Sequence, residues 1–122
     1  MLANPYQKYR QNQVETVSPQ KLIVMLYSGA IKFLKLAQAG LAEKNLEKTH
    51  QNIVKTQDII FELMNSLDLE KGEVAHNLHA LYDYMHTRLV EANLKKQEEP
   101  LQEVEQMMTE LRDAWAQVIH AT

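Results

Sequence analysis

Histidine and carboxylate side chains gather in one stretch of the sequence, HNLHALYDYMHTRLVEANLKK, residues 76–96. If this stretch is helical, His79, Asp83 and His86 stand at positions i, i+4 and i+7 and share one face, with His76 one turn earlier. Imidazole and carboxylate groups at this spacing could bind a metal ion or transfer protons. The same spacing is common on solvated helix faces, and a polar face on the side away from the apolar stripe is the interpretation we favour.

Two Glu-x-x-His pairs, Glu47 with His50 and Glu73 with His76, match the element that di-iron bundles place on two of their helices. Both pairs fall near the expected starts of consecutive helices. If those helices are antiparallel, the pairs are separated by roughly 30 Å for a helix of about 20 residues. The chain has no cysteine, which excludes a thiolate metal site and a disulfide. We therefore predict no metal site and no cofactor.

The stretch AHNLHAL at residues 75–81 resembles the phosphoacceptor sequence of histidine phosphotransfer domains, which are also four-helix bundles. In that family a lysine three residues after the histidine offsets the phosphate charge, and a glycine follows the lysine. His79 and Ala80 occupy those positions here. A phosphotransfer-like signalling bundle with His76 as phosphoacceptor is therefore the alternative function. No serine lies in a glycine elbow and no glycine loop could cradle phosphate, so no enzyme activity is predicted.

Length and composition indicate one domain of ordinary size. The chain has 122 residues, a formal net charge of −3 and a pI near 5.9. This balance argues against a nucleic-acid partner, which requires a concentrated basic surface. The N-terminus lacks the apolar run of a signal peptide, and no uninterrupted apolar stretch reaches the ~18 residues of a membrane span. We expect a cytoplasmic protein without membrane insertion.

Long amphipathic segments with few turn residues predict an all-α protein. Only three glycines and three prolines are present, and no segment alternates as a half-buried strand does. Helix starts are indicated by Ser18 before Pro19, by Asn45 and by Pro100, and Gly72 marks a turn. The expected helices cover about residues 18–43, 45–68, 72–97 and 100–120. They predict an antiparallel up-and-down four-helix bundle, residues 18–122, preceded by an N-terminal cap segment, residues 1–17.

Each expected helix has an apolar stripe at three- and four-residue steps, which predicts the core. The stripes are Ile23, Leu26, Ala30, Phe33, Ala37 and Leu41; Leu46, Ile53, Ile60, Met64 and Leu67; Val74, Leu78, Leu81, Met85, Leu89 and Ala92; and Leu101, Val104, Met108, Leu111, Trp115 and Val118.

Apolar side chains outside these stripes exceed what a closed bundle needs. They are Val24, Tyr27, Ile31 and Leu34 in the first helix and Ile59, Phe61 and Leu63 in the second. Such residues either pack against neighbouring helices or line a groove for a partner's amphipathic helix. The groove candidates are Val24, Tyr27, Ile31, Ile59, Phe61 and Leu63, with Tyr84 added because it falls off the stripe of the third helix.

Three blocks of sequence together resemble the FliS family of flagellin export chaperones. They are TVSPQKLIVMLYSGAIKFL at residues 16–34, NLHALYDYMHTRLVEAN at residues 77–93 and EVEQMMTELRDAWAQVI at residues 103–119. The blocks keep the family's order and spacing and span essentially the whole chain. Val17 departs from the pattern, because the family usually has a small residue before its Ser-Pro pair.

The resemblance implies an ATP-independent secretion chaperone that binds the C-terminal segment of flagellin. Such a protein prevents premature polymerisation and aids delivery to the flagellar type III export apparatus through an export gate component. The family also suggests that the N-terminal segment covers client-binding apolar surface and is displaced by flagellin. Tyr6 and Tyr9 would then be the residues of a removable cap.

Overall fold

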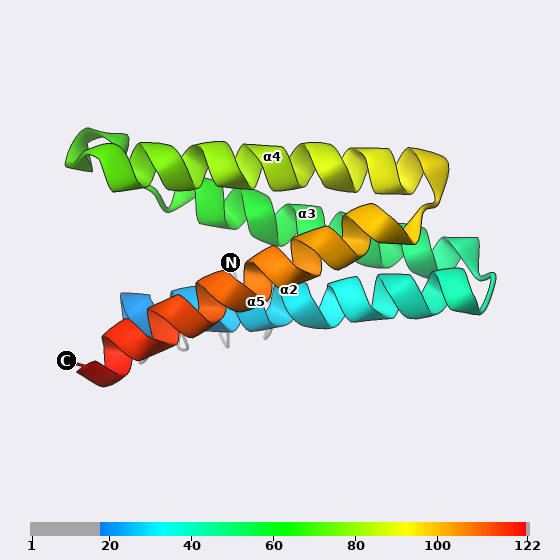
Figure 1. Ribbon diagram of the computed structural model, residues 1–122, viewed down its shortest axis with the longest axis horizontal. Coiled ribbons are helices and arrows are strands. Elements are labelled where there is room, and N and C mark those ends of the chain that lie inside the picture. The colour runs from blue at the N-terminus through cyan, green and yellow to red at the C-terminus, as the bar shows by residue number, and fades with distance from the viewer. Residues whose placement is uncertain (1–17, 122) are drawn as a thin grey trace, which may run out of the picture.

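The structure is a computed structural model that describes residues 18–121. It confirms an all-α four-helix bundle, and among the described residues there is no strand. The helices are α2 Pro19–Ala42, α3 Leu46–Asn65, α4 Glu73–Lys95 and α5 Glu98–Ala121, with a short 3₁₀ helix, η1 Leu69–Lys71, before α4. Consecutive helices run back along one another, and α5 lies obliquely across α2 (Figure 1). The predicted cap segment, with Tyr6 and Tyr9, lies outside the described residues.

The helix starts follow the chemistry of their capping residues. The Ser18 hydroxyl accepts a hydrogen bond from the Lys21 amide at 3.3 Å, and the Asn45 side-chain oxygen accepts one from the Lys48 amide at 3.0 Å. Each cap satisfies an amide that has no partner within its helix. Gly72 precedes α4 with φ 103°, a backbone conformation that glycine adopts without steric cost.

Two helix boundaries differ from the sequence prediction. The last helix begins at Glu98, so Pro100 is its third residue. Proline fits there because first-turn amides have no acceptor within the helix. The second helix ends at Asn65, where the Ser66 hydroxyl donates to the Leu63 carbonyl at 2.7 Å, and η1 then occupies part of the predicted turn. The start was predicted from Pro100 and the end from Gly72. Such residues mark a helix boundary only to within about one turn.

The second apolar stripe of the first helix packs inside the bundle. Helix α2 makes its most extensive contacts with both α3 and α5, so it needs two apolar faces. Tyr27, Ile31 and Leu34 are buried beside Ala30 of the main stripe. Packing against neighbouring helices is therefore sufficient to explain this stripe.

The apolar character of α2 also makes it the described helix that is long and apolar enough to cross a membrane by length and composition. A central helix of a bundle meets the same criterion, because its neighbours cover its sides. The contacts of α2 with α3 and α5 bury residues such as Tyr27, Ala30 and Leu34, and 28% of the apolar window of α2 is buried.

The core contains the predicted stripes except at their ends and at Phe33. This side chain is half-buried and lies outside the core, with the Lys55 ammonium 5.4 Å from its ring centroid. Buried members include Ile53, Met85, Leu89 and Met108. The predicted core positions Leu46, Val74 and Val118 are instead exposed, Val74 with 71% of its surface accessible. All three lie near helix ends, where the regular stripe continues beyond the neighbouring helices that would cover it.

A polar strip on α3 was not predicted as core. Thr49 and Thr56 are fully buried and Asn52 nearly so. The Thr49 hydroxyl donates to the carbonyls of Asn45 and Ala37, the second of which belongs to α2. A Cβ at Gly40 would stand 2.5 Å from the Thr49 hydroxyl oxygen and 2.8 Å from its amide nitrogen. The α2–α3 hairpin therefore closes at a point where only glycine fits.

Candidate functional site

Three of the seven groove candidates lie within the core. Tyr27 and Leu63 have no accessible surface and Ile31 has 6%. While the bundle is closed, these side chains are enclosed by its own helices. The surface available to a partner must come from the remaining candidates and from residues around them.

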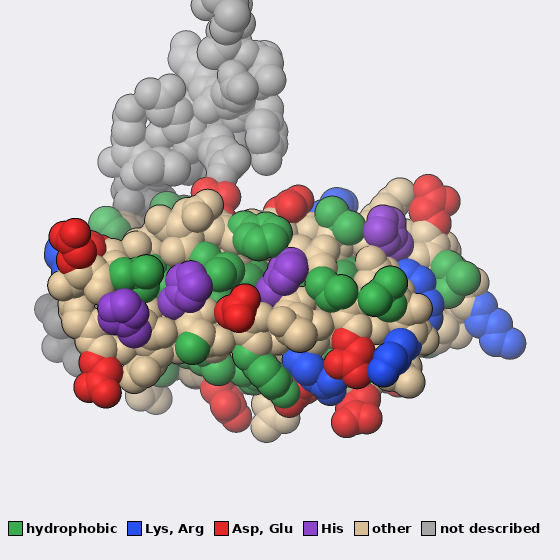
Figure 2. Space-filling model, turned by 90° about the horizontal axis from the view of Figure 1, so that it is seen from above, with side chains coloured by type: hydrophobic (Ala, Val, Ile, Leu, Met, Phe, Trp, Pro, Cys, Tyr) green, Lys and Arg blue, Asp and Glu red, His purple; other side chains and the backbone are tan. Residues whose placement is uncertain are grey.

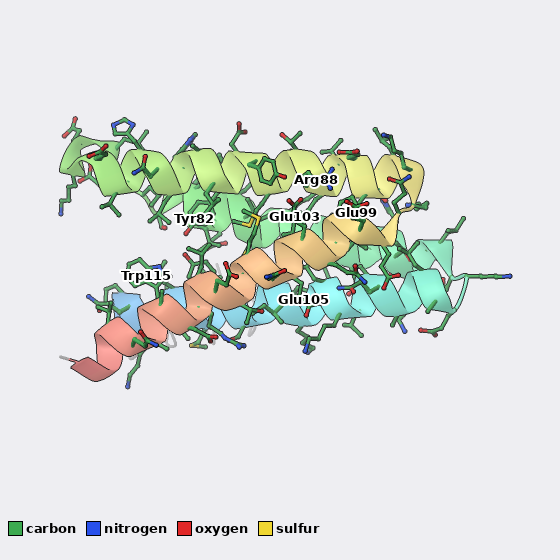
Figure 3. The ribbon with its side chains drawn as sticks, in the orientation of Figure 1. Tyr82, Arg88, Glu99, Glu103, Glu105 and Trp115 are labelled. Atoms are coloured by element: carbon green, nitrogen blue, oxygen red, sulfur yellow. The ribbon has the colours of Figure 1, made fainter. Side chains whose placement is uncertain are left out.

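The Tyr27 hydroxyl lies 2.5 Å from that of Tyr82, which joins α2 to α4 inside the core. Burial raises the pKa of both phenols, and for Tyr82 the hydrogen bond with Tyr27 raises it further. The Trp115 indole of α5 lowers the pKa of Tyr27, against the effect of burial. Figure 3 shows Trp115 and Tyr82 toward the same end of the bundle. The two neutral hydroxyls tie α2 to α4, and Trp115 of α5 packs against the same core.

Val24 and Ile59 are half-buried. The Ile59 Cδ1 atom would lie 3.3 Å from a Cβ placed at Gly29, so Ile59 packs against α2. Its role in the structure is to fill the contact between α2 and α3. These two side chains can border a groove, but they offer only part of their surface.

Phe61 and Tyr84 are the exposed candidates, and they belong to different sides of the molecule. Phe61 has 47% of its surface accessible, and its ring centroid lies 4.8 Å from that of His86 on α4. The Tyr84 hydroxyl donates to Glu103 on α5 at 2.8 Å. The structure therefore does not bring the seven candidates together in one groove.

Tyr84 is part of an ionic network that holds α5 against α4. The Arg88 Nε atom donates to Glu103 at 2.6 Å, and its Nη1 atom donates to Glu91 at 2.7 Å. The Lys95 ammonium reaches the other oxygen of Glu91 at 3.3 Å. Hydrogen bonds from Arg88 and then Tyr84 lower the pKa of the Glu103 carboxyl. Arg88 and Glu103 face each other between the two helices (Figure 3), so these groups serve helix packing.

A hollow of about 460 Å³ lies along α2 and α3 and includes Phe61. Its lining residues are Leu22, Ile23 and Leu26 of α2, Asp58, Phe61 and Glu62 of α3, and Asn65 and Ser66 at the end of α3. We call this the α2–α3 groove. It combines an apolar wall with a carboxylate rim, which suits an amphipathic segment with a basic edge.

Sequence reasoning missed most of the apolar wall. Ile23 and Leu26 were placed in the core stripe, and they do pack partly against the core. Their remaining surface lines the α2–α3 groove. Periodicity identifies the direction in which a side chain points, but it cannot identify a side chain shared between core and groove.

The histidines do not assemble a reactive centre among the described residues. His76 is exposed, His79 and His86 are half-buried, and no group of three or more His, Asp or Glu side chains is placed to hold a metal ion. A hydrogen bond of 2.9 Å joins the side chains of His50 and Asn93. Asn93 lies near the end of α4, and His76 lies near its start. The two Glu-x-x-His pairs therefore lie at opposite ends of the α3–α4 pair.

Comparison with known proteins identifies relatives along nearly the full chain. The family model described as "Flagellar protein FliS" matches residues 2–122. The flagellar secretion chaperone FliS of Bacillus subtilis (strain 168) is 42% identical over 120 residues, which cover 98% of this chain and 90% of that protein. The protein of the same name from Campylobacter jejuni is 40% identical over 114 residues, covering 93% and 89%.

A solved structure described as a flagellar chaperone from bacteria has the same fold. It superposes with a TM-score of 0.81 and covers 96% of each chain at 19% sequence identity. The structural match and the sequence matches each extend over more than nine-tenths of the chain, so neither depends on a single motif. The chain therefore belongs to the FliS family of flagellar secretion chaperones, whose members are named for chaperoning and not for catalysis.

Proposed function

We propose that this protein is a cytoplasmic, ATP-independent export chaperone that binds the C-terminal segment of flagellin. It keeps flagellin from polymerising before export and aids delivery to the flagellar type III export apparatus through an export gate component. Membership of the FliS family is the observation that carries this proposal. The α2–α3 groove supports it, because a half-exposed apolar wall is the kind of surface that a client segment can cover.

The energetics of such binding follow from the client's own surface. A flagellin monomer outside the filament presents apolar stripes that invite association. Covering them on the bundle stabilises the complex by ~25 cal/mol per Å² of apolar area removed from water, less the entropy of ordering the segment. The interaction requires no cofactor and no chemical step.

Calorimetric titration of the full chain with the C-terminal segment of flagellin from the same organism tests the proposal. The titration is carried out at two temperatures. We expect saturable binding with a negative heat-capacity change, because apolar area is buried. A folded protein that gives no heat of binding at either temperature would contradict the proposed client.

The groove is tested by Phe61→Ser, with Leu69→Ser as the matched control. Both side chains are exposed, Phe61 at 47% and Leu69 at 41%, but Leu69 lies in η1 and does not line the α2–α3 groove. Loss of the aromatic anchor should weaken binding of the flagellin segment by about tenfold, whereas the control should leave the dissociation constant unchanged. Equal affinities for both variants would place the client elsewhere.

The N-terminal segment is proposed to cover the client-binding surface, with Tyr6 and Tyr9 as its contact residues. Leu22 and Ile23 of the groove lie in the first turns of α2, the helix that follows this segment in the sequence. A self-segment that competes with the client lowers client affinity by its own docking energy. Deletion of residues 2–15 should therefore tighten flagellin binding or increase self-association, measured by calorimetry and by sedimentation. Unchanged values in both experiments would refute the cap.

The phosphotransfer alternative gains no support from the described surroundings of His76. The histidine is exposed at the start of α4, but His79 and Ala80 stand where that family has its lysine and glycine. Incubation with a phosphorylated receiver domain should leave His76 unmodified.

A further inference from the structure

The outer surface where α3 and α4 lie side by side has its own chemical character. On α3 it is formed by Leu46, His50, Val54, Gln57 and Phe61, which recur at intervals of three and four residues. On α4 it is formed by His79, Asp83, His86, Val90, Asn93 and Leu94, with Lys96 at the end. We call this surface the α3–α4 seam.

Contacts between the two helices show that the seam is one continuous surface. His50 and Asn93 are hydrogen bonded at 2.9 Å, and the rings of Phe61 and His86 lie 4.8 Å apart. Histidine and hydrophobic side chains follow one another along this face, as Figure 2 shows, while most charged side chains lie toward its margins.

Aliphatic side chains are unusually accessible at one end of the seam. Leu94 has 81% of its surface exposed and Leu46 has 56%, and Val54 and Val90 are also exposed. Val90 and Leu94 line a hollow of about 330 Å³ together with His50, Gln57, Asn93 and Lys96. The helices α3 and α4 leave this apolar surface uncovered by the described residues.

Ionised side chains are sparse on the seam and frequent next to it. Among the seam residues only Asp83 and Lys96 are charged at neutral pH, whereas Glu47, Lys55 and Asp58 occupy neighbouring exposed positions of α3. Depletion of charge with retention of aromatic and aliphatic groups is typical of the core of a protein interface. No ion pair engages Asp83 within residues 18–121, and the Lys96 ammonium donates to Asn93.

We propose that the α3–α4 seam docks an amphipathic helix of a second protein partner, distinct from the segment bound in the α2–α3 groove. The partner helix lies along the seam with aliphatic residues on Val90 and Leu94, a basic residue opposite Asp83 and an acidic residue opposite Lys96. Asp83 and Lys96 are thirteen positions apart in sequence, about 20 Å along a helix, so a partner helix needs at least about four turns to reach both. This inference does not depend on flagellin being the client.

The charge pattern provides the test, with two synthetic helical peptides of about five turns as probes. Both carry a leucine stripe and one glutamate, and they differ at the position about 20 Å away, which is lysine in the matched peptide and glutamate in the control. The full chain should bind the matched peptide about tenfold more tightly by fluorescence anisotropy. Asp83→Lys should reverse this preference, because it replaces attraction to the lysine with attraction to the second glutamate.

The aliphatic contact is tested by Leu94→Ser, which should weaken binding of both peptides by about tenfold. Leu69→Ser is the matched control, because Leu69 is an exposed leucine beyond the opposite end of α4 and should have no effect. Both replaced leucines are exposed, and circular dichroism checks that each variant is folded.

Three results would overturn the inference. Asp83→Lys could leave the peptide preference unchanged, or Leu94→Ser could leave both affinities unchanged. Leu94→Ser could weaken binding of the flagellin segment, in which case the seam belongs to the client surface. Sedimentation could show that Leu94→Ser abolishes a dimer, in which case a second copy of this chain occupies the seam.

Discussion

The hydroxyl groups of Tyr27 and Tyr82 depend on each other. Their oxygen atoms are 2.5 Å apart in the buried core, so each hydroxyl supplies part of the hydrogen bonding that the other has lost from water. A buried polar group without a partner costs free energy that a paired group does not. The pair joins α2 to α4, which have few other direct contacts.

Tyr82→Phe should reduce the free energy of unfolding by about 1–3 kcal/mol, because the Tyr27 hydroxyl then lacks its partner in the core. The double variant Tyr27→Phe with Tyr82→Phe should be less destabilised than the sum of the single variants, because no hydroxyl remains unpaired. Urea unfolding followed by Trp115 fluorescence provides the measurement. Additive effects would show that the two hydroxyls are stabilised separately.

At the scale of elements, two glycines of α2 face α3 in different ways. A Cβ at Gly40 would meet the Thr49 hydroxyl and amide at 2.5 and 2.8 Å, and the amide belongs to the backbone of α3. A Cβ at Gly29 would meet only the flexible end of Ile59 at 3.3 Å. Replacement by alanine raises helix propensity at both positions, but only at Gly40 does it create a severe clash with α3.

Gly40→Ala should lower the free energy of unfolding by about 1–3 kcal/mol, because α2 and α3 must move apart at the hairpin. Gly29→Ala should change it by less than about 1 kcal/mol in either direction, because the gain in helix propensity offsets the shift of Ile59. Thermal unfolding of both variants under identical conditions tests the contrast. Equal destabilisation would mean that the close approach at Gly40 does not limit stability.

At the scale of the whole molecule, the central position of α2 organises both the core and the α2–α3 groove. Its contacts with α3 and α5 enclose Tyr27 and Ile31, while its first turns contribute Leu22 and Leu26 to the α2–α3 groove. The α3–α4 seam is formed by other residues, apart from Phe61, which belongs to both surfaces. A chaperone built in this way could hold a client in the groove and a second helix on the seam.

The amino-acid sequence by itself determined the helical class, the number of long helices and most of their starts. Local chemistry was sufficient for this, because a cap such as Ser18 or Asn45 acts on amides within its own first turn. The stripes containing Ile53, Met85 and Met108 likewise identify the buried side of each helix from its own periodicity.

Only the tertiary structure decided which apolar residues are core and which are surface. Tyr27, Ile31 and Leu63 resembled spare surface but are enclosed, whereas Leu46 and Val74 fit the core stripes but are exposed. Periodicity defines the direction of a side chain around its own helix axis. Burial depends on where the neighbouring helices begin, end and cross, and those positions are set by contacts between residues far apart in the sequence.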